Sequence, residues 1–270
     1  MINSALKELK YIFNQKNLIS QFTKREITSR YKGSYLGLLW SIVTPLMMLI
    51  IYTFVFSAVL KTKWGTGEET SKVEFALLLL AGLLTFNFFA EVISRAPSLI
   101  TANTNYVKKV VFPLEILPIV SLGTALFQAF ISYVVLIIAS VVLMGDFQWT
   151  VFLFPIILIP LMLLTLGLSW FLASFGVYVR DTSQVIALII PALMFMSPIF
   201  YPISIIPDEF QIIYWFNPLT YIVEDARRVL VWGQLPHWDW FLYGSIIGLA
   251  VALIGYIWFK KTRKGFADVL

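Results

Sequence analysis

The residues best suited to chemistry lie together in the last third of the chain, as Glu224-Asp225-Ala226-Arg227-Arg228. Neighbouring carboxylates and guanidiniums can take part in acid–base or group-transfer reactions. At helical spacing, however, Glu224 and Arg228 stand four residues apart on one face, which predicts an ordinary ion pair. We therefore expect this cluster to be structural rather than catalytic.

Other reactive groups are scarce. The chain has no cysteine and one histidine, His237, which excludes disulfides, thiolate metal sites, cysteine nucleophiles and sites built on two histidines. The sequence contains none of the patterns G-x-x-x-x-G-K-[ST], H-E-x-x-H and G-x-S-x-G. We therefore predict no catalytic residue and no metal site, and no ATP hydrolysis through a Walker-type loop of this chain.

The composition places these residues in a membrane protein. Of the 270 residues, 59% are hydrophobic and 13% are charged, and the mean hydropathy is +0.84. A helix needs about 20 mostly apolar residues to cross a bilayer. Windows of that size recur six times, which predicts an all-α integral membrane protein with six transmembrane helices in a single domain, 1–270. The windows are 33–60, 75–94, 116–145, 147–179, 182–207 and 240–259.

Lys and Arg are distributed unevenly between the two predicted sides. With the N-terminus inside, the inner segments hold fifteen Lys and Arg and the outer segments hold five. This bias predicts that both termini are cytoplasmic. The same asymmetry accounts for the net charge of +5 without a nucleic-acid partner. The inner segments are 1–32, 95–112, 180–181 and 260–270, and the main outer segments are 61–74 and 208–239.

The N-terminal segment is expected to lie on the cytoplasmic membrane surface. Residues 2–20 repeat apolar side chains at helical spacing with lysines between them, which is typical of an amphipathic interfacial helix. The sequence favours a simple surface anchor for this helix, and a gate beside a substrate entrance is a compatible second interpretation. The stretch after it is either a positive-inside topology signal, which the residues alone favour, or a collar that binds an acidic or phosphorylated headgroup. The headgroup candidates are Arg25, Arg30, Tyr31 and Lys32.

The largest internal cytoplasmic loop is 95–112. It is polar and long enough for a short helix, so a soluble partner must use this loop or the termini. Glu91 and Glu115 lie within a turn or two of this boundary, near Arg95 and Lys108-Lys109. We expect interfacial salt bridges there rather than an intramembrane function for the two acids.

The fifth window is interrupted by four prolines, each of which lacks the N–H of a regular helix. The uncharged run 210–223 that follows is too short to span and suits a re-entrant segment. Irregular backbone at membrane depth must be buried in protein or line a cavity. We therefore predict that 197–236 forms the outer end of a pathway, the alternative being an ordinary external cap. In the sixth window, Gly244-xxx-Gly248 permits close helix packing.

Five stretches, in order along the chain, resemble the permease subunit of type-two ABC exporters of the polysaccharide-export branch, which serve O-antigen, capsular polysaccharide and wall teichoic acid. They are RYKGSYLGLLW at 30–40 with Pro45 after it, VRD at 179–181, SPIFYP at 197–202, NPLTY at 217–221 with Arg227 after it, and FADVL at 266–270. Together they extend over nearly the whole chain.

The resemblance implies a half-transporter in the cytoplasmic membrane of a bacterium. Two copies of this chain would pair with two copies of a separate ABC ATPase, which would bind ATP and Mg while this chain binds no cofactor. The cargo would be a lipid-linked glycan or polyol phosphate, and membrane lipids would be further partners. The loop 95–112 would contain the coupling helix, and 208–239 would form outer gate helices. The implied ATPase-coupling residues are Thr104, Asn105, Tyr106, Lys108, Lys109, Arg180 and Asp181.

Aromatic side chains are candidates for the polymer pathway because their faces stack on sugar rings. For any single one of them, contact with lipid or packing in the core is the favoured explanation. The conduit and gate candidates are Trp40, Phe88, Phe89, Phe195, Phe200, Tyr201 and Asn217.

Two other functions compete with polymer export. An ABC exporter of drugs or small lipids would use the same architecture with a closed, narrow dimer seam. A membrane-embedded glycosyl- or phosphotransferase would need metal-binding carboxylates on one face. The sequence has no Asp-x-Asp-like pair beside a span, which disfavours the transferase.

Overall fold

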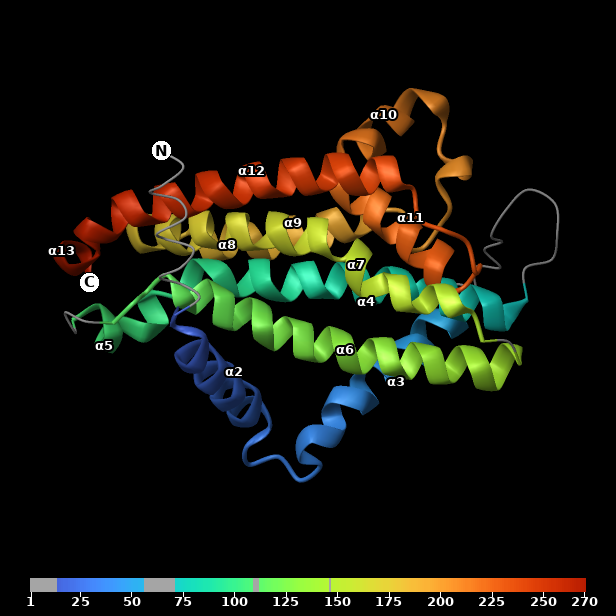
Figure 1. Cartoon of the computed structure of the whole chain (residues 1–270), viewed down its shortest axis with the longest axis horizontal. Coiled ribbons are helices and arrows are strands. Elements are labelled where there is room, and N and C mark those ends of the chain that lie inside the picture. Colours follow the sequence, from blue (N-terminus) through green and yellow to red (C-terminus); the bar gives the residue numbers. More distant parts are fainter. Residues whose placement is uncertain (1–13, 56–70, 109–111, 146) are drawn as a thin grey trace.

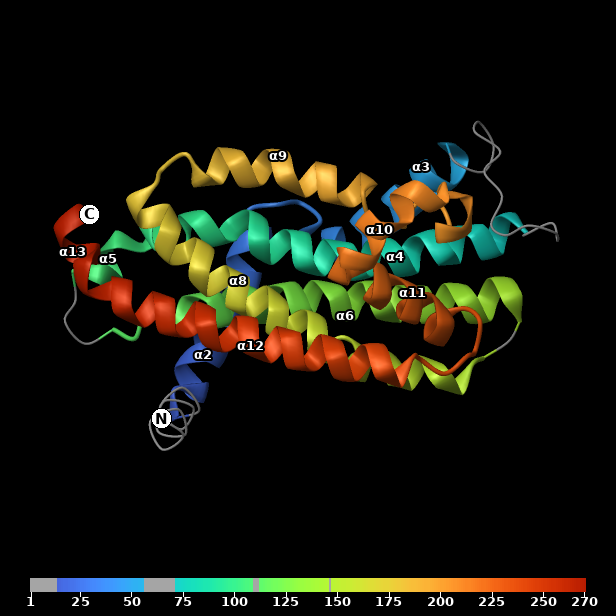
Figure 2. The ribbon, with the colours of Figure 1, turned by 90° about the horizontal axis from the view of Figure 1, so that it is seen from above.

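The computed structural model describes residues 14–55, 71–108, 112–145 and 147–270, apart from the side chain of Tyr52. Within these ranges the regular secondary structure is helical, with no strand. The long helices lie side by side along the long axis of the molecule (Figures 1 and 2). One end of the molecule carries α2 (Lys16–Tyr31), α5 (Thr104–Val107) and α13 (Phe266–Val269), and the other carries α10 (Asp208–Phe216) and α11 (Pro218–Leu230).

Four of the six predicted windows are occupied by helices long and apolar enough to cross a membrane, at Lys72–Ser98, Ile116–Met144, Trp149–Tyr178 and Trp238–Val269. They contain α4 (Lys72–Arg95), α6 (Ile116–Met144), α8 (Ile159–Tyr178) and α12 (Trp238–Thr262). η5 (Trp149–Leu153) and α7 (Phe154–Ile157) precede α8. The first and fifth windows hold shorter apolar helices, α3 (Trp40–Thr53), which η1 (Gly37–Leu39) precedes, and α9 (Thr182–Phe195).

The fifth window, 182–207, is not one continuous helix. α9 ends at Phe195, and only η6 (Ile203–Ile205) is helical between there and Pro207. The run 210–223 is likewise divided at Asn217, whose side chain accepts a hydrogen bond from the Leu219 N–H at 3.0 Å and caps α11. The breaks follow the prolines, which cannot donate to a helix ladder.

α4 lies at the centre of the bundle. Sixteen of its 24 residues are buried, and it contacts α3, α6, α8, α9 and α11. Its sequence is apolar around the whole helix, which is the pattern of a helix enclosed by others. Ser71 begins it as a cap, since its hydroxyl accepts from the Glu74 N–H at 3.1 Å.

α8 and α12 approach closely through glycines. A methyl group on Gly255 would come within 2.1 Å of the Gly167 carbonyl oxygen, and one on Gly248 within 2.8 Å of the Pro160 carbonyl oxygen. Small residues allow such backbone contact between membrane helices. The close packing expected at Gly244-xxx-Gly248 is thus confirmed, with α8 as the partner.

α2 extends through the basic segment and ends at Tyr31, where a turn separates it from α3. Gly33 (φ 88°) and Gly37 (φ 51°) have left-handed backbone in this turn, which favours glycine. Residues 1–13, with most of the predicted surface helix 2–20, lie outside the described residues, as do 56–60 of the first window. Three short elements complete the end near α2: η3 (Ala96–Ser98), η4 (Thr101–Asn103) and η7 (Arg263–Gly265).

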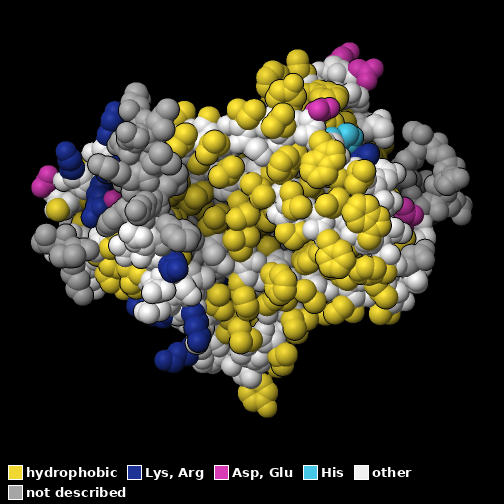
Figure 3. Space-filling view, in the orientation of Figure 1, with side chains coloured by type: hydrophobic (Ala, Val, Ile, Leu, Met, Phe, Trp, Pro, Cys, Tyr) yellow, Lys and Arg dark blue, Asp and Glu magenta, His cyan; other side chains and the backbone are white. Residues whose placement is uncertain are grey.

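The surface divides by charge along the same axis. Hydrophobic side chains cover most of the middle of the visible face, and most of the visible Lys and Arg gather at the end that carries α2, α5 and α13 (Figure 3). This is the end predicted to be cytoplasmic from the Lys and Arg count.

Candidate functional site

A cavity of about 330 Å³ lies between α3, α4 and α6 and begins at the C-terminal end of α2. It brings together two headgroup candidates, Arg30 and Tyr31, and two conduit candidates, Trp40 and Phe88. Along α4 its lining extends from Glu91 to Leu80, or about 16 Å at 1.5 Å per residue. The cavity therefore leads from the basic end of the molecule toward the middle of the bundle.

The lining has a polar entrance and a mostly apolar interior. Arg30 forms an ion pair with Glu91 at the entrance, and Asn87 is exposed farther along α4. Trp40 is 44% exposed and can contact a cavity occupant, whereas Phe88 is 2% exposed and forms part of the wall. Such a cavity can hold a phosphorylated group near Arg30 and apolar or ring-shaped groups deeper inside.

Gln128 on α6 holds the entrance together, and sequence reasoning missed it. The Tyr31 hydroxyl donates to its Oε1 at 2.9 Å, and its Nε2 donates to the Ser41 carbonyl at 2.9 Å. One amide thus connects the end of α2 with the start of α3. The only sequence signal was a glutamine inside an apolar window, where a polar side chain must find partners.

Four charged residues join α2 to α4 beside this entrance. Arg95 pairs with Glu26 and lies 4.0 Å from Glu91, which also pairs with Arg30. The interfacial salt bridge expected between Glu91 and Arg95 is therefore present, with Arg30 as an additional partner. An anion that enters the cavity would compete with Glu91 for Arg30.

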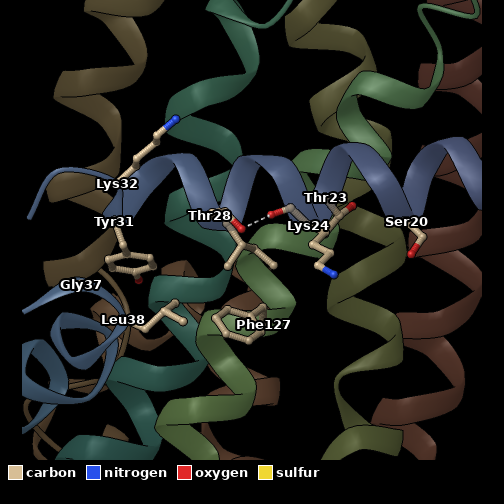
Figure 4. Close-up of a pocket in the computed structure, with 10 residues that line it drawn as sticks. Ser20, Thr23, Lys24, Thr28, Tyr31, Lys32, Gly37, Leu38 and Phe127 are labelled. Carbon is tan, nitrogen blue, oxygen red and sulfur yellow. Dashed lines mark hydrogen bonds between the residues drawn. The ribbon is translucent and has the colours of Figure 1, made fainter.

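A second, more open groove of about 630 Å³ lies on the α6-facing side of α2. Lys24, Tyr31 and Lys32 line it together with the exposed Leu38 (Figure 4). Tyr31 lines both this groove and the cavity at Arg30, whereas Lys32 lines this groove.

The fourth headgroup candidate, Arg25, faces the coupling region. Its Nη2 donates to the Tyr106 hydroxyl at 3.1 Å, and its guanidinium lies 4.6 Å from the centre of the Phe22 ring. Arg25 lines a separate cavity of about 240 Å³ with Glu26 and Arg95. The structure therefore does not bring it together with Arg30, Tyr31 and Lys32.

The predicted coupling residues lie at the same end of the molecule. Thr104, Asn105 and Tyr106 belong to α5, Lys108 follows that helix, and Lys109 lies outside the described residues. The Tyr106 ring stacks on Phe112, with centroids 4.4 Å apart, which fixes α5 against the chain beyond it. Asn105 and Lys108 are exposed and available to a partner.

Arg180 and Asp181 lie at the α8–α9 junction, and both are exposed. Just before this junction, a methyl group on Gly176 would come within 2.1 Å of the Pro97 carbonyl oxygen. The start of the coupling loop therefore packs directly on the end of α8, which places the two predicted coupling segments side by side.

The C-terminal segment also packs on this region. The buried Glu115 pairs with Arg263 at 2.5 Å, and Arg263 Nη2 donates to the Phe112 carbonyl at 3.0 Å. The interfacial salt bridge expected for Glu115 is therefore present, although its partner is Arg263 and not the neighbouring Lys108. The partner comes from 148 residues along the chain, which no local pattern indicates.

At the opposite end, the gate candidates gather around the break after α9. The Phe195 and Phe200 ring centroids are 5.6 Å apart, and the Tyr201 hydroxyl lies 2.8 Å from that of Tyr214. Asn217 Nδ2 donates to Ser197 Oγ at 2.9 Å. These residues form one cluster, separate from the cavity at Arg30. Phe89 lines neither the cavity at Arg30 nor this outer cluster; it is 5% exposed and packs in the core.

Arg227, at the centre of this outer end, is 0% exposed. It pairs with Glu224 at 3.4 Å and donates to the Ile199 and Leu78 carbonyls at 2.8 and 3.3 Å. The expected Glu224–Arg228 pair is wrong, since Arg228 Nε donates to the Leu235 carbonyl at 2.9 Å. Helical spacing allows Glu224 to pair with Arg227 or with Arg228, and in the structure it pairs with the buried Arg227, three residues away.

Asp225 is buried beside this arginine and faces the α11–α12 connection. The His237 N–H donates to its Oδ1 at 3.0 Å, and His237 Nδ1 lies 2.8 Å from the same oxygen. Burial raises the pKa of the Asp225 carboxyl, and these contacts act in the opposite direction. Throughout the described ranges, no three His, Cys, Asp or Glu side chains are grouped as a metal site would require.

Comparison with known proteins accords with this arrangement. The family described as ABC-2 type transporter matches residues 17–231. The chain is 28% identical over 269 residues to an O-antigen export system permease protein RfbA of Klebsiella pneumoniae, with 97% of each chain covered. It is 23% identical over 270 residues to the protein of that name from Myxococcus xanthus, covering 97% of this chain and 99% of the relative.

A further relative is the polysialic acid transport protein KpsM of Escherichia coli, at 25% identity over 257 residues, covering 93% of this chain and 95% of the relative. The matched residues 17–231 are well over half of the chain and contain the cavity, the coupling region and the outer cluster. This protein belongs to the ABC-2 type transporter family.

Proposed function

We propose that this chain is the permease of an ATP-driven exporter that moves a lipid-linked cell-surface polysaccharide across the cytoplasmic membrane of a bacterium. The observation that carries this proposal is its similarity, over nearly its whole length, to permeases named for O-antigen export and polysialic acid transport. O-antigen-like polysaccharide and wall teichoic acid are the cargo classes considered.

In this proposal the chain crosses the membrane six times as a single domain. The four long apolar helices supply four crossings, and α3 and α9 supply the first and fifth. The basic end that carries α2, α5 and α13 is cytoplasmic, in agreement with the Lys and Arg count. The α10–α11 pair then lies at the outer surface as the gate helices.

ATP would be bound and hydrolysed, with Mg, by a separate subunit in two copies, working on a dimer of this chain. The membership of the chain in the ABC-2 type transporter family and the lack of a phosphate-loop motif in its sequence support this division of labour. We assign docking to α5 with Lys108 and Lys109, and to Arg180 and Asp181. Support comes from the close packing of Pro97 on Gly176, which allows both segments to respond to one partner.

The cavity at Arg30 would receive the cargo. Arg30 and Tyr31 in this cavity, with Lys32 in the adjoining groove, would hold the phosphate of the lipid carrier, and Trp40 would contact sugar rings, with Phe88 behind it as a wall. Arg25 bonds to Tyr106 instead, so we place it between cargo site and coupling helix. Phe195, Phe200, Tyr201 and Asn217 would belong to the outer gate.

Complementation of a bacterium that lacks the chromosomal copy tests this function. The wild-type chain should restore polymer at the cell surface and remove lipid-linked polymer from the cytoplasmic side. Lys32→Gln should lower export several-fold, because it removes one phosphate ligand. Lys261→Gln, the matched loss of an exposed cytoplasmic lysine on α12, should export normally. Restored growth without surface polymer, or export of small lipids alone, would contradict the proposal.

A further inference from the structure

A groove of about 510 Å³ lies at the outer end, and none of its lining residues is among the headgroup, coupling, conduit or gate candidates. Its walls come from α11 and the end of α10 on one side, and from α7, α8 and the first three turns of α12 on the other. On α12 the lining extends from Asp239 to Gly248, about 13.5 Å at 1.5 Å per residue. That length is close to half of the roughly 30 Å hydrocarbon core.

The lower part of the groove is apolar. Ile157, Leu164 and Ile247 line it, and the glycines of α12 form its floor beside Pro160. Gly244 has only the Pro160 side chain near its Cβ position, at 3.2 Å, so the floor is smooth at that point. A hydrocarbon chain is the occupant that such a lining and length favour in a membrane.

The upper part carries a continuous aromatic wall. The ring centroids of Trp215 and Tyr221 are 6.3 Å apart, and those of Tyr221 and Trp240 are 4.9 Å apart. The Tyr221 hydroxyl donates to the Trp215 carbonyl at 2.6 Å, and the His237 ring lies against Trp240, with centroids 3.8 Å apart. These contacts hold the wall in place before any ligand binds.

The mouth of the groove is acidic. Asp225 and Asp239 both line it. Asp225 is engaged by His237 and lies near Arg228, whereas Asp239 forms no ion pair with a described residue. Carboxylates beside Trp and Tyr rings attract an ammonium group and repel a bare phosphate.

We propose that this groove binds an outer-leaflet phospholipid whose headgroup carries a primary ammonium, with one acyl chain lying along α12 from Asp239 to Gly248. The ammonium lies between Asp239 and the Trp240 ring. The acidic mouth makes this site distinct from the basic cavity proposed for the phosphorylated cargo. The assignment rests on the proposed orientation, which places α10 and α11 outside.

The test compares lipid retention by the purified full-length chain together with its ATPase partner. Phosphatidylethanolamine and phosphatidylglycerol with identical acyl chains are supplied in equal amounts, and bound lipid is counted by native mass spectrometry. Wild-type protein should retain phosphatidylethanolamine with a preference of roughly fivefold or more, the scale of a cation–π contact with a nearby carboxylate. Equal retention, or a preference for phosphatidylglycerol, would overturn the proposal.

Two pairs of variants locate the site. Ile247→Trp should fill the groove and lower retention of both lipids, whereas Ile246→Trp, an equally exposed neighbour that does not line the groove, should retain the preference. Asp239→Asn should remove the preference and keep the acyl contact, with Glu209→Gln as the exposed acidic control. Retention unaffected by Ile247→Trp and Asp239→Asn would place the lipid elsewhere. The assay measures lipid binding and not transport, so a negative result would overturn the lipid site and leave the proposed export function untouched.

Discussion

The guanidinium of Arg227 donates a hydrogen bond to the main-chain carbonyl of Ile199 at 2.8 Å. This contact ties α11 to the irregular segment between α9 and η6, where a carbonyl has no helical partner. The same side chain reaches Leu78 on α4, so one buried cation connects three parts of the outer end. Arg227 is therefore the residue around which the outer gate region is assembled.

Arg227→Ala should destabilise the folded chain strongly. The change leaves the Ile199 carbonyl without its donor, removes the additional contact to the Leu78 carbonyl and removes the partner of Glu224, which we expect to cost about 3 kcal/mol or more. The measurement is the thermal unfolding midpoint in detergent. Arg228→Ala, which loses a single bond to the Leu235 carbonyl, is the control and should unfold near the wild-type temperature. Equal unfolding midpoints for the two variants would show that Arg227 does not stabilise the outer end more than Arg228 does.

Locking the outer break should stop export reversibly. Asn217 Nδ2 and Ser197 Oγ are 2.9 Å apart, so these two side chains meet across the break, and the double change Ser197→Cys with Asn217→Cys in this cysteine-free chain tests whether a disulfide formed there on oxidation locks it. Surface polymer should disappear under oxidation and return on reduction, because the gate helices can no longer move away from α9. Each single cysteine variant controls for loss of the Asn217 cap, worth about 1 kcal/mol. Undiminished export through an efficiently cross-linked protein would mean that the segment is a passive cap.

Single cysteines should report the proposed topology. Ser98 and Glu209 are both exposed and lie at opposite ends of the molecule. An impermeant thiol reagent added to intact cells should label Glu209→Cys and leave Ser98→Cys unlabelled until the membrane is opened. Labelling of Ser98→Cys from outside would reverse the assigned orientation.

Substitution in α5 should uncouple ATP hydrolysis from transport. Asn105 is exposed on this short helix, so Asn105→Ala should fold normally yet lower the polymer exported per ATP hydrolysed, by severalfold. The readout is ATPase activity and transport of the same reconstituted complex. Gln234→Ala, an exposed amide on the α11–α12 connection, should leave the ratio unchanged. The permease purified alone should show no ATPase activity at all.

Removing Arg263 should loosen the coupling region through Glu115. Arg263→Ala removes the cation that pairs with the buried Glu115 carboxylate among the described residues and frees the Phe112 carbonyl, at an expected cost of roughly 1–3 kcal/mol. The thermal midpoint should fall, and proteolysis should reach the 99–114 segment sooner. Adding Glu115→Gln should recover part of the loss, since a neutral amide needs no counter-charge. A double variant less stable than Arg263→Ala would show that the carboxylate is satisfied in another way.

The sequence alone predicted the long apolar helices and the break after α9. Apolar windows and charge counts predicted the long helices within a few residues, because crossing hydrocarbon demands a length that composition reveals directly. The prolines after Phe195 predicted an irregular fifth segment. These properties depend on residue type and local spacing alone.

Tertiary structure decided which residues meet. Arg227 and Arg228 both stand within one helical turn of Glu224, yet Arg227 is the one buried against α4 and the segment after α9, and Glu115 pairs with Arg263 rather than with Lys108 of the adjacent loop. Arg30 and Trp40 share a cavity while Arg25, five residues from Arg30, faces Tyr106. Such partners depend on how helices distant in the chain are packed, because a buried charge pairs with whatever the bundle brings within reach.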